Sequence, residues 1–383
     1  MKGETLATID PLIPPSDFVG LQGVTHLCTG GEAPWLHQFE AVHADFGRLK
    51  SGGLAGRAEV YRRGEACRAS MARLWGVSAE RIGFLPCAAE GMNWLARGLD
   101  WRSGDNVVTD NLEFPSVAYA WRQLEDLGVE VRMVRHHDWR VREADLLDAV
   151  DARTRVLAVS QVSFYTGQNL DIVRLADGLR SRSDACLLAI DSTHASGVVE
   201  VSAAVTDLCV SSCYKWLLAT HGTAPCYVSE RASGMVADSS FGWHNLAVWP
   251  PQGAERAPTV EVKPMPQRLE PGNPAMVVIL FLEHALQRLL AIGMDTIQDH
   301  ALELSRRIET GLRARGRNVI SPSTAAARSG NTCFLDDDAA GLTRRLAGQD
   351  VLVWGEYGRV RVSGHLFNTG DDVDRFFEVL DSL

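Results

Sequence analysis

Short apolar runs alternate with longer amphipathic segments through the middle of the chain. The apolar runs have the length and the Val, Ile and Leu content of buried strands; they cover residues 81–85, 105–110, 129–134, 155–160, 186–191 and 207–212. The segments between them repeat apolar residues at helical spacing, as in residues 116–128, 142–151 and 170–182. This alternation predicts βαβ units, so we expect an α/β domain with a mostly parallel sheet covered on both faces.

The pattern changes on both sides of this region. Before it, residues 53–75 carry apolar residues at helical spacing. After it comes a long helical stretch over residues 276–316, followed by strand-like runs and a closing helix; these later elements cover residues 331–337, 350–354, 359–364 and 371–383. We therefore predict an N-terminal segment (1–20), a large domain (21–272) and a smaller α+β C-terminal domain (273–383).

Composition narrows the class of protein. Hydrophobic residues at 46% and charged residues at 22% are typical of a globular chain. A net charge of −10 leaves no excess of basic residues for phosphates, which argues against a nucleic-acid or membrane-surface partner. The eight cysteines are scattered without a CxxC pair, so we expect reduced core thiols and no metal site. No signal peptide and no membrane-spanning run is found, so we expect a cytoplasmic protein.

One lysine stands out at the end of a predicted buried strand. Lys215 lies in SSCYKWLLATHGT, an otherwise uncharged stretch, and a buried ammonium is costly unless it is paired, neutralised or used chemically. Asp191 ends the preceding strand, and His194 follows it. Adjacent parallel strands would bring this lysine and carboxylate to one edge of the sheet. Pyridoxal phosphate needs such a pair, because it forms a Schiff base with a lysine and keeps its ring nitrogen protonated beside an aspartate. Taken alone, Lys215 could be a lysine that extends its amine to solvent, and Asp191 could be an aspartate that caps the next turn.

Other strand ends offer groups that suit the same cofactor. The small residues Ala88 and Ala89 open a helix after residues 81–85, where backbone N–H groups could bind a phosphate. Phe114 follows the strand at 105–110 and could stack on a planar ring. The remaining polar candidates follow the last strands; they are Gln161, Ser163, Ser212 and Tyr214. Each of these residues could also have a purely structural role, and only their combination points specifically to pyridoxal phosphate.

The motifs CAAEGMN, NLEFPS, AVSQVSFYTG, IDSTHASG, SSCYKWLLATHGT, RLEPGNP and VRVSGHLFNT resemble, in this order, those of a known family. They are similar to the fold-type-I pyridoxal-phosphate enzymes of the class V aminotransferase group, which includes cysteine desulfurases, isopenicillin N epimerase-like proteins and kynureninases. The resemblance covers most of the chain and implies pyridoxal 5'-phosphate as the cofactor.

The resemblance also implies roles for individual residues. Lys215 would be the Schiff-base lysine, Asp191 the partner of the pyridinium nitrogen, and His194 a neighbour of the ring's phenolic oxygen. Arg361 would hold the carboxylate of an amino acid substrate, a task that suits a guanidinium fork. By the same resemblance, Ala88, Ala89, Ser212 and Tyr214 would form the phosphate site and Phe114 would stack on the ring, while Gln161 is expected at the cofactor from its place after the strand at 155–160. RLEPGNP resembles a segment that crosses a dimer interface, which implies a homodimer with Gly272 and Asn273 near the partner's site.

Three departures from the family pattern bear on the reaction. Ala88 and Ala89 replace the threonines of many relatives, so phosphate binding would rely on backbone N–H groups, Ser212 and Tyr214. Phe114 stands where cysteine desulfurases stack a histidine. Desulfurases carry a persulfide cysteine on a loop shortly before the arginine motif, whereas this chain reads LVWGEYGRVRVSG there, and Cys333 lies well upstream. Sulfur transfer through an enzyme persulfide is therefore not expected.

These features favour a lyase that cleaves the side chain of an amino acid, such as β-elimination at a C–S bond, through an external aldimine and an α-carbanion. Transamination and epimerisation remain alternatives, and a non-catalytic pyridoxal-phosphate-binding protein is a remote one. A dinucleotide-dependent dehydrogenase would require a GxGxxG turn, which is absent. Besides Lys215 and His194, the candidates for proton transfer or substrate contact are Gln161, Trp243, His244 and His365. Trp35, Trp243 and Trp354 could line an apolar entrance.

Overall fold

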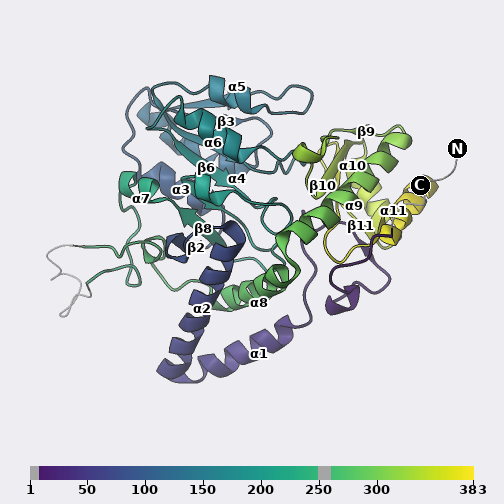
Figure 1. The fold of residues 1–383 in the computed structure, drawn as a ribbon, viewed down its shortest axis with the longest axis horizontal. Coiled ribbons are helices and arrows are strands. Elements are labelled where there is room, and N and C mark those ends of the chain that lie inside the picture. The colour runs from purple at the N-terminus through teal and green to yellow at the C-terminus, as the bar shows by residue number, and fades with distance from the viewer. Residues whose placement is uncertain (1–7, 249–259) are drawn as a thin grey trace.

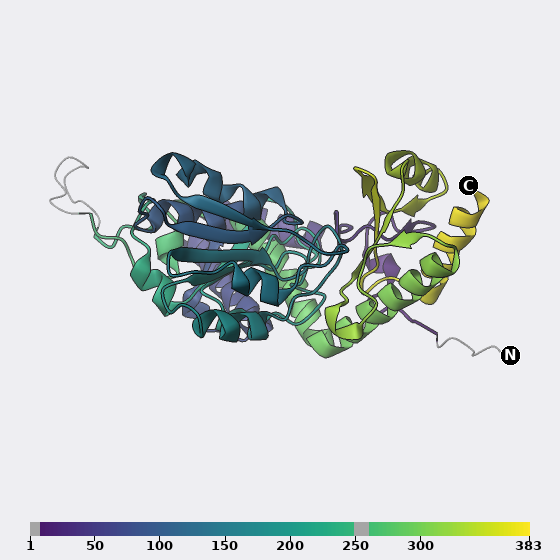
Figure 2. The same cartoon turned by 90° about the horizontal axis from the view of Figure 1, so that it is seen from above.

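The structure is a computed structural model that describes residues 8–248 and 260–383. Figure 1 and Figure 2 show a larger lobe built around a central sheet and a smaller lobe formed by the C-terminal elements, with the long green helices connecting them. The strands and helices of both lobes follow the predicted order.

The central sheet has seven strands in the order β2-β8-β7-β6-β5-β3-β4. Their bounds are β2 Ile82–Leu85, β3 Asn106–Asp110, β4 Glu130–Val134, β5 Thr154–Ser160, β6 Leu187–Asp191, β7 Leu208–Val210 and β8 Ala224–Val228. The strands from β7 to β4 run parallel, whereas β8 lies antiparallel to both β7 and β2. The prediction of a mostly parallel sheet is thus confirmed, but the sequence pattern did not reveal the antiparallel strand β8 between the edge strand β2 and β7.

Helices cover both faces of this sheet because successive strand residues point to opposite sides. Val107 and Val156 pack on the side of α3 and η3, whereas Val108 and Leu157 pack on the side of α5 and α6. The bounds of the covering elements are α3 Ala89–Gly98, α4 Pro115–Ala118, η3 Ala120–Leu127, α5 Glu143–Asp148, α6 Ile172–Arg180 and α7 Glu230–Met235. The single helix predicted over 116–128 is instead the short α4 followed by the 3₁₀ helix η3.

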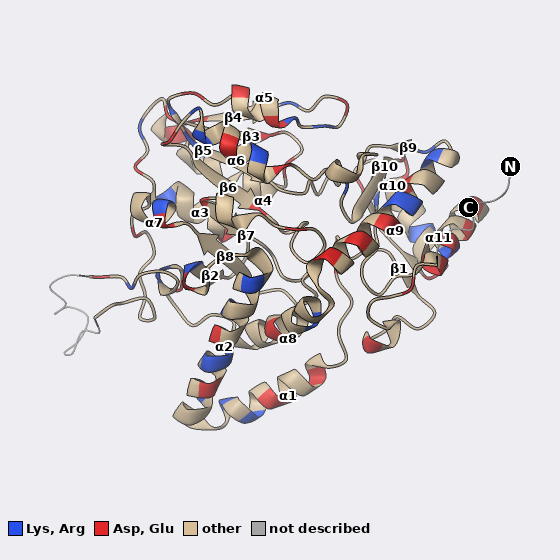
Figure 3. Cartoon of the chain, viewed as in Figure 1, with Lys and Arg blue, Asp and Glu red and all other residues tan. Residues whose placement is uncertain are grey.

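Three further helices, α1 (Phe39–Lys50), α2 (Gly53–Trp75) and α8 (Met276–Ile292), pack together in the large lobe. The α8 residues Ile279 and Leu282 share a core with Met71 of α2. This packing places α8 with the large lobe, although the predicted domain boundary at residue 273 would assign it to the small one. Acidic and basic side chains alternate along the exposed parts of α1 and α2 (Figure 3), where Arg62 and Arg63 pair with Glu59.

The helical stretch predicted over 276–316 is broken at Gly293. Gly293 has φ 92° and ψ 138°, a conformation that glycine adopts readily, and α9 (Met294–Ala314) leaves it at 86° to α8. Among the described residues no single helix is long and apolar enough to cross a membrane, and α8 and α9 meet that criterion only as this bent pair.

The small lobe contains a four-stranded sheet in the order β12-β13-β10-β9. Its elements are β9 Asn318–Val319, β10 Asn331–Leu335, α10 Ala339–Ala347, β12 Trp354–Glu356, β13 Arg359–Ser363 and α11 Gly370–Ser382. Val360 and Val362 pack on one face with Leu304 of α9 and Phe376 of α11. The N-terminal segment joins this lobe, because β1 (Thr25–His26) pairs with β11 (Val351–Leu352). Short 3₁₀ helices complete the fold; they are η1 Pro15–Asp17, η2 Ala79–Arg81, η4 Ala203–Val205, η6 Gln267–Leu269 and η7 Ala325–Ala327.

Candidate active site

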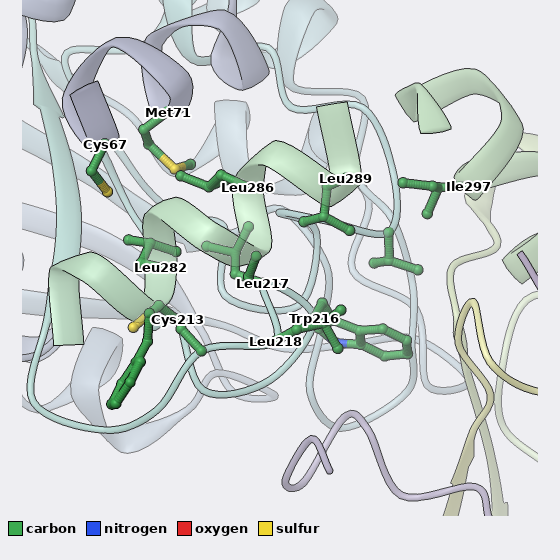
Figure 4. Packing of buried hydrophobic residues seen from close by; sticks show 14 of the residues in the cluster. Cys67, Met71, Cys213, Trp216, Leu217, Leu218, Leu282, Leu286, Leu289 and Ile297 are labelled. Carbon is green, nitrogen blue, oxygen red and sulfur yellow. The ribbon is translucent and has the colours of Figure 1, made fainter. Parts of the chain in front are cut away.

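Lys215 is held by a loop that is anchored in the core of the large lobe. The flanking residues Cys213, Trp216 and Leu217 are fully buried, and they belong to the same core as Leu282 of α8. Figure 4 shows these side chains around the α8 helix. Because its neighbours are packed in this way, the backbone at Lys215 is fixed, and its side chain is only 8% exposed. The lysine does not extend into solvent.

The Lys215 amine lies in a pocket at the carboxyl ends of β5, β6 and β7. Its Nζ is 3.0 Å from Nε2 of His194. Burial and the positive charge of Arg361 lower the pKa of Lys215 to about 7, so a large fraction of the amine is neutral near pH 7. The pocket is lined by Ala88, Phe114, Ser116, Ser160, Val162, Phe164, Asp191, Thr193, His194, Ser212, Tyr214 and Lys215.

Asp191 places a carboxylate on the same edge of the sheet. It is the last residue of β6, and its Oδ1 accepts a hydrogen bond of 2.8 Å from the backbone N–H of Thr193. The Thr193 hydroxyl in turn accepts a hydrogen bond of 2.9 Å from the N–H of Ser212. Burial raises the pKa of Asp191. A buried carboxylate of this kind suits a cationic partner, and a pyridinium N–H is such a partner.

The rest of the pocket fits the other parts of pyridoxal phosphate. Helix α3 begins at Ala89, and no side chain caps its first N–H groups. Uncapped N–H groups at a helix N-terminus favour an anion, and Ser212 and Tyr214 line the same pocket. The Phe114 ring is 40% exposed and lies 5.8 Å from the Lys215 amine, which offers an aromatic face to a planar ring.

Arg361 approaches this pocket from the small lobe. Its Nη1 donates a hydrogen bond of 3.1 Å to the backbone oxygen of Phe164, and its guanidinium lies 5.0 Å from the ring of Trp354. Its Nε is buried and has no hydrogen-bond partner among the described residues. The backbone at Gly30 approaches so closely that a Cβ there would lie 3.2 Å from this Nε. Arg361 is not itself one of the residues that line the pocket; it reaches the edge of the pocket through its hydrogen bond to Phe164, which does line it. The unmatched Nε donor fits an anionic group of a substrate.

Two predicted contacts are not made within the pocket. Gln161 lies between Ser160 and Val162, which line the pocket, so strand alternation turns its side chain away; its Nε2 donates to the backbone oxygen of Glu200 at 2.7 Å. His365 is fully buried, with its Nε2 3.0 Å from the backbone oxygen of Gly197. Burial lowers the pKa of His365 to about 3. The structure therefore gives Gln161 and His365 structural contacts where the sequence predicted ligand contacts.

Trp243 and Asn273 also lie outside the residues that line the Lys215 pocket. The Trp243 ring is 44% exposed and lies 5.2 Å from the Arg57 guanidinium. Asn273 accepts hydrogen bonds from Arg57 and Tyr61 and borders a groove of about 530 Å³ between α1, α2 and the start of α8. Among the other tryptophans predicted at the entrance, Trp35 packs on Phe39 and Phe281, and Trp354 lies against Arg361.

The sequence did not single out three residues that support the site. The Glu113 carboxylate accepts a hydrogen bond of 2.6 Å from the Ser160 hydroxyl, and burial together with Asp110 raises the pKa of Glu113 well above its usual range. Asn331 of β10 places its Nδ2 3.0 Å from Nδ1 of His194, and Phe164 packs on Phe114 with 5.0 Å between ring centroids. Glu113 could have been noticed as the charged residue of NLEFPS, but no local pattern marks Asn331. No cluster of three possible metal ligands occurs in the described residues.

Comparisons with known proteins agree with this arrangement. The profile described as Aminotransferase class-V matches residues 42–376. A cysteine desulfurase of Salmonella agona is 27% identical, over 89% of this chain and 86% of its own. A probable cysteine desulfurase of Methanothermobacter thermautotrophicus is 23% identical over 83% of each chain, and an uncharacterized protein of Schizosaccharomyces pombe is 26% identical over 83% of this chain and 74% of its own.

Solved structures show the same fold. The cysteine desulfurase of Thermococcus onnurineus superimposes with a TM-score of 0.86 at 18% identity, over 96% of both chains. A cystine C–S lyase, solved with its product cysteine persulfide, superimposes with a TM-score of 0.86 at 19% identity, over 95% of this chain and 98% of its own. The chain therefore belongs to the class-V aminotransferase family of pyridoxal-phosphate-dependent enzymes and has their fold-type-I architecture.

Proposed function

We propose that this enzyme cleaves the side chain of an amino acid by β-elimination, with a C–S bond as the preferred bond, and that Lys215 is its cofactor lysine. The support is a pocket that combines a partly neutral buried amine, a buried carboxylate and an uncapped helix N-terminus within one chain. Bound pyridoxal phosphate supplies an electron sink that allows a bond at the α-carbon to break.

The surrounding residues have complementary tasks in this proposal. Arg361 binds the substrate carboxylate and so fixes the orientation of the α-carbon. The Lys215 amine, released to its neutral form, accepts the α-proton, since its pKa of about 7 is close to working pH. His194 is held neutral by burial, which lowers its pKa well below the usual range, so it acts as a hydrogen-bonding group beside the lysine. Asp191 pairs with the ring nitrogen of the cofactor.

A tight hairpin supports elimination without a persulfide cysteine. Strands β12 and β13 are joined by Tyr357 and Gly358 alone, with φ of 53° and 73°, the conformation of a two-residue turn between paired strands. This connection leaves no extended loop before Arg361 that could bring a thiol to a substrate. Cys333 is fully buried in β10, and burial raises the pKa of its thiol. This observation carries the preference for a lyase over sulfur transfer through the enzyme. The cystine C–S lyase of similar fold gives a precedent for such a reaction.

The groove beside Asn273 supports the proposal of a homodimer. Its lining is largely apolar and includes Leu54, a residue that is 83% exposed. We propose that a second copy of the chain covers it and that Gly272 and Asn273 thereby approach the partner's cofactor site. Leu54→Arg should give a monomer in light scattering that binds the cofactor more weakly. A Leu54→Arg protein that remains dimeric would argue against this interface.

The central experiment is a product assay without a keto acid. The cofactor-loaded enzyme is mixed with L-cysteine, L-cystine and cysteine thioethers, and pyruvate, ammonia and thiol are measured over many turnovers. Continuous release of pyruvate and ammonia is expected, and it should persist in Cys333→Ala. Loss of turnover in Cys333→Ala would overturn the proposed elimination mechanism.

Transamination is the second candidate, favoured by relatives that include an uncharacterized aminotransferase of Schizosaccharomyces pombe, 24% identical over 78% of this chain and 76% of its own. A single conversion of the cofactor that is reversed only by a keto acid would establish that reaction instead. Epimerisation would appear as a change in optical rotation of the amino acid without release of ammonia.

A further inference from the structure

A second arginine lies beside the proposed carboxylate-binding residue. Arg359 and Arg361 are two positions apart on β13, so their side chains share one face of the strand. Val360 and Val362 occupy the other face and pack into the core of the small lobe. Both arginines are therefore directed out of that core, toward the segment of the large lobe that follows β5.

Arg359 binds the backbone of this segment tightly. Its Nη1 donates hydrogen bonds of 2.8 Å to the oxygen of Phe164 and 2.5 Å to the oxygen of Tyr165. Its guanidinium lies 3.9 Å from the Tyr165 ring centroid and 4.7 Å from that of Trp354. The Phe164 ring centroid lies 5.1 Å away, so Arg359, with only 2% of the residue exposed, is fixed by two carbonyl groups and three aromatic faces.

The same carbonyl oxygen links Arg359 to the proposed substrate site. Arg361 also donates to the oxygen of Phe164, at 3.1 Å. The Phe164 ring packs against Phe114, the ring proposed to stack on the cofactor. A change in the position of Phe164 would thus displace both the carboxylate-binding arginine and the aromatic wall of the pocket.

The two arginines also carry an unbalanced charge. Within the described residues, neither is paired with a carboxylate closer than 4.0 Å, and the Nε atom of each is buried without a partner. Carbonyl groups and aromatic faces stabilise a guanidinium but do not cancel its charge. The pair therefore produces a positive potential at the edge of the pocket, which an anionic substrate group would balance.

We propose that Arg359 is a positioning residue for substrate binding: it fixes the Phe164 carbonyl that orients Arg361, and its charge strengthens the attraction of Arg361 for the substrate carboxylate. Arg359 need not touch the substrate, because it acts through Phe164 and through the electrostatic potential. This inference rests on the proposed function, in which Arg361 binds the carboxylate of an amino acid.

The test compares L-alanine with ethylamine, which is the same amine without a carboxylate. Cofactor-loaded wild type, Arg359→Met and Arg359→Lys are titrated with each compound, and binding is followed by the visible absorption of the cofactor. Arg140→Gln is the matched control: Arg140 lies on the large lobe and donates to the Ile320 carbonyl of the small lobe, so it makes a hydrogen bond between the lobes as Arg359 does, but it has no hydrogen bond to Phe164. Thermal unfolding and cofactor content are measured for every variant.

Arg359→Met should bind L-alanine roughly tenfold or more weakly, with ethylamine binding unchanged. Arg359→Lys retains the charge but loses the double hydrogen bond, so its loss should be intermediate, and Arg140→Gln should match wild type. Equal weakening of both compounds, or wild-type binding of L-alanine by Arg359→Met and Arg359→Lys, would overturn the inference. A wild-type protein whose absorption responds to neither compound would overturn the inference alone, whereas the absence of pyruvate and ammonia from cysteine, cystine and thioethers with the same sample would overturn the proposed function, and the inference with it.

Discussion

The two sides of the candidate active site are built in different ways. On the large lobe, Lys215 is fixed because Cys213, Trp216 and Leu217 are packed in an apolar core. On the small lobe, Arg361 is fixed by a backbone carbonyl, the face of Trp354 and the close approach of Gly30. The first side depends on hydrophobic packing, and the second depends on directional polar contacts that cross between the lobes.

This difference suggests a division of tasks. A core-anchored lysine keeps its position when the lobes shift slightly, because the packing that holds it lies within one lobe. The position of Arg361 depends on how the two lobes are placed, because Arg361 belongs to the small lobe and its partner Phe164 belongs to the large lobe. We therefore expect cofactor attachment to be robust and substrate binding to be sensitive to contacts between the lobes.

Removal of the lysine should have the largest effect. Lys215→Ala deletes the amine that attaches the cofactor and moves the α-proton, so turnover should fall by roughly 1,000-fold or more. The assay of pyruvate and ammonia measures this loss, and borohydride reduction followed by peptide mass spectrometry should find no cofactor on the 211–223 segment. Lys263→Ala is the matched control, because Lys263 is a half-buried lysine that donates to the His244 carbonyl outside the Lys215 pocket. Covalent labelling at a different lysine in the wild type would contradict the assignment.

Disruption of the packing behind the lysine should mainly reduce stability. Trp216 is fully buried, and Trp216→Ala should lower the free energy of unfolding by about 3–5 kcal/mol, as large aromatic deletions do. Denaturant titration of the cofactor-free protein measures this change. Arg361→Met, on the other side of the pocket, should change stability far less, because its charge is costly to bury. Similar losses for both variants would remove the contrast between the two sides.

Replacement of the arginine should mainly reduce substrate binding. Arg361→Lys keeps a positive charge but loses the planar fork, so kcat/KM for a carboxylate-bearing substrate should fall by roughly 100-fold while cofactor loading remains. Steady-state kinetics and the visible spectrum separate these two quantities. A variant with normal kcat/KM would show that the substrate carboxylate binds elsewhere.

The pH dependence of cofactor uptake should show the smallest effect. Only a neutral amine attacks an aldehyde, and the pKa of Lys215 is about 7, so uptake should be slow below pH 7 and reach a plateau above it. The Arg361 charge lowers this pKa, and Arg361→Met should therefore shift the midpoint to higher pH. The rate at which the visible band appears after addition of cofactor measures both profiles. A midpoint near the usual pKa of a solvent-exposed lysine would contradict the buried environment of Lys215.

The order of strands and helices could be predicted because each element carries its own periodic pattern. The helix over residues 53–75 and the strands ending at Asp110, Ser160 and Asp191 were found close to their observed bounds. The break at Gly293 was missed, because both flanking segments are strongly helical and one glycine in such a stretch is often tolerated. The pattern also could not show that β8 would lie antiparallel between β2 and β7, since pairing direction depends on the path of the chain.

The sequence by itself determined which groups could do chemistry: Lys215 and Asp191 at the ends of adjacent strands, and an arginine near the C-terminus. Only the tertiary structure decided which side chains face the pocket. Gln161 turns away because strand alternation directs Ser160 and Val162 inward, and His365 is enclosed by Gly197 and Trp216. Asn331 and Arg359 reach the pocket region because the small lobe folds back against the large one. Contacts between distant segments leave no local pattern, and these are the contacts that complete the site.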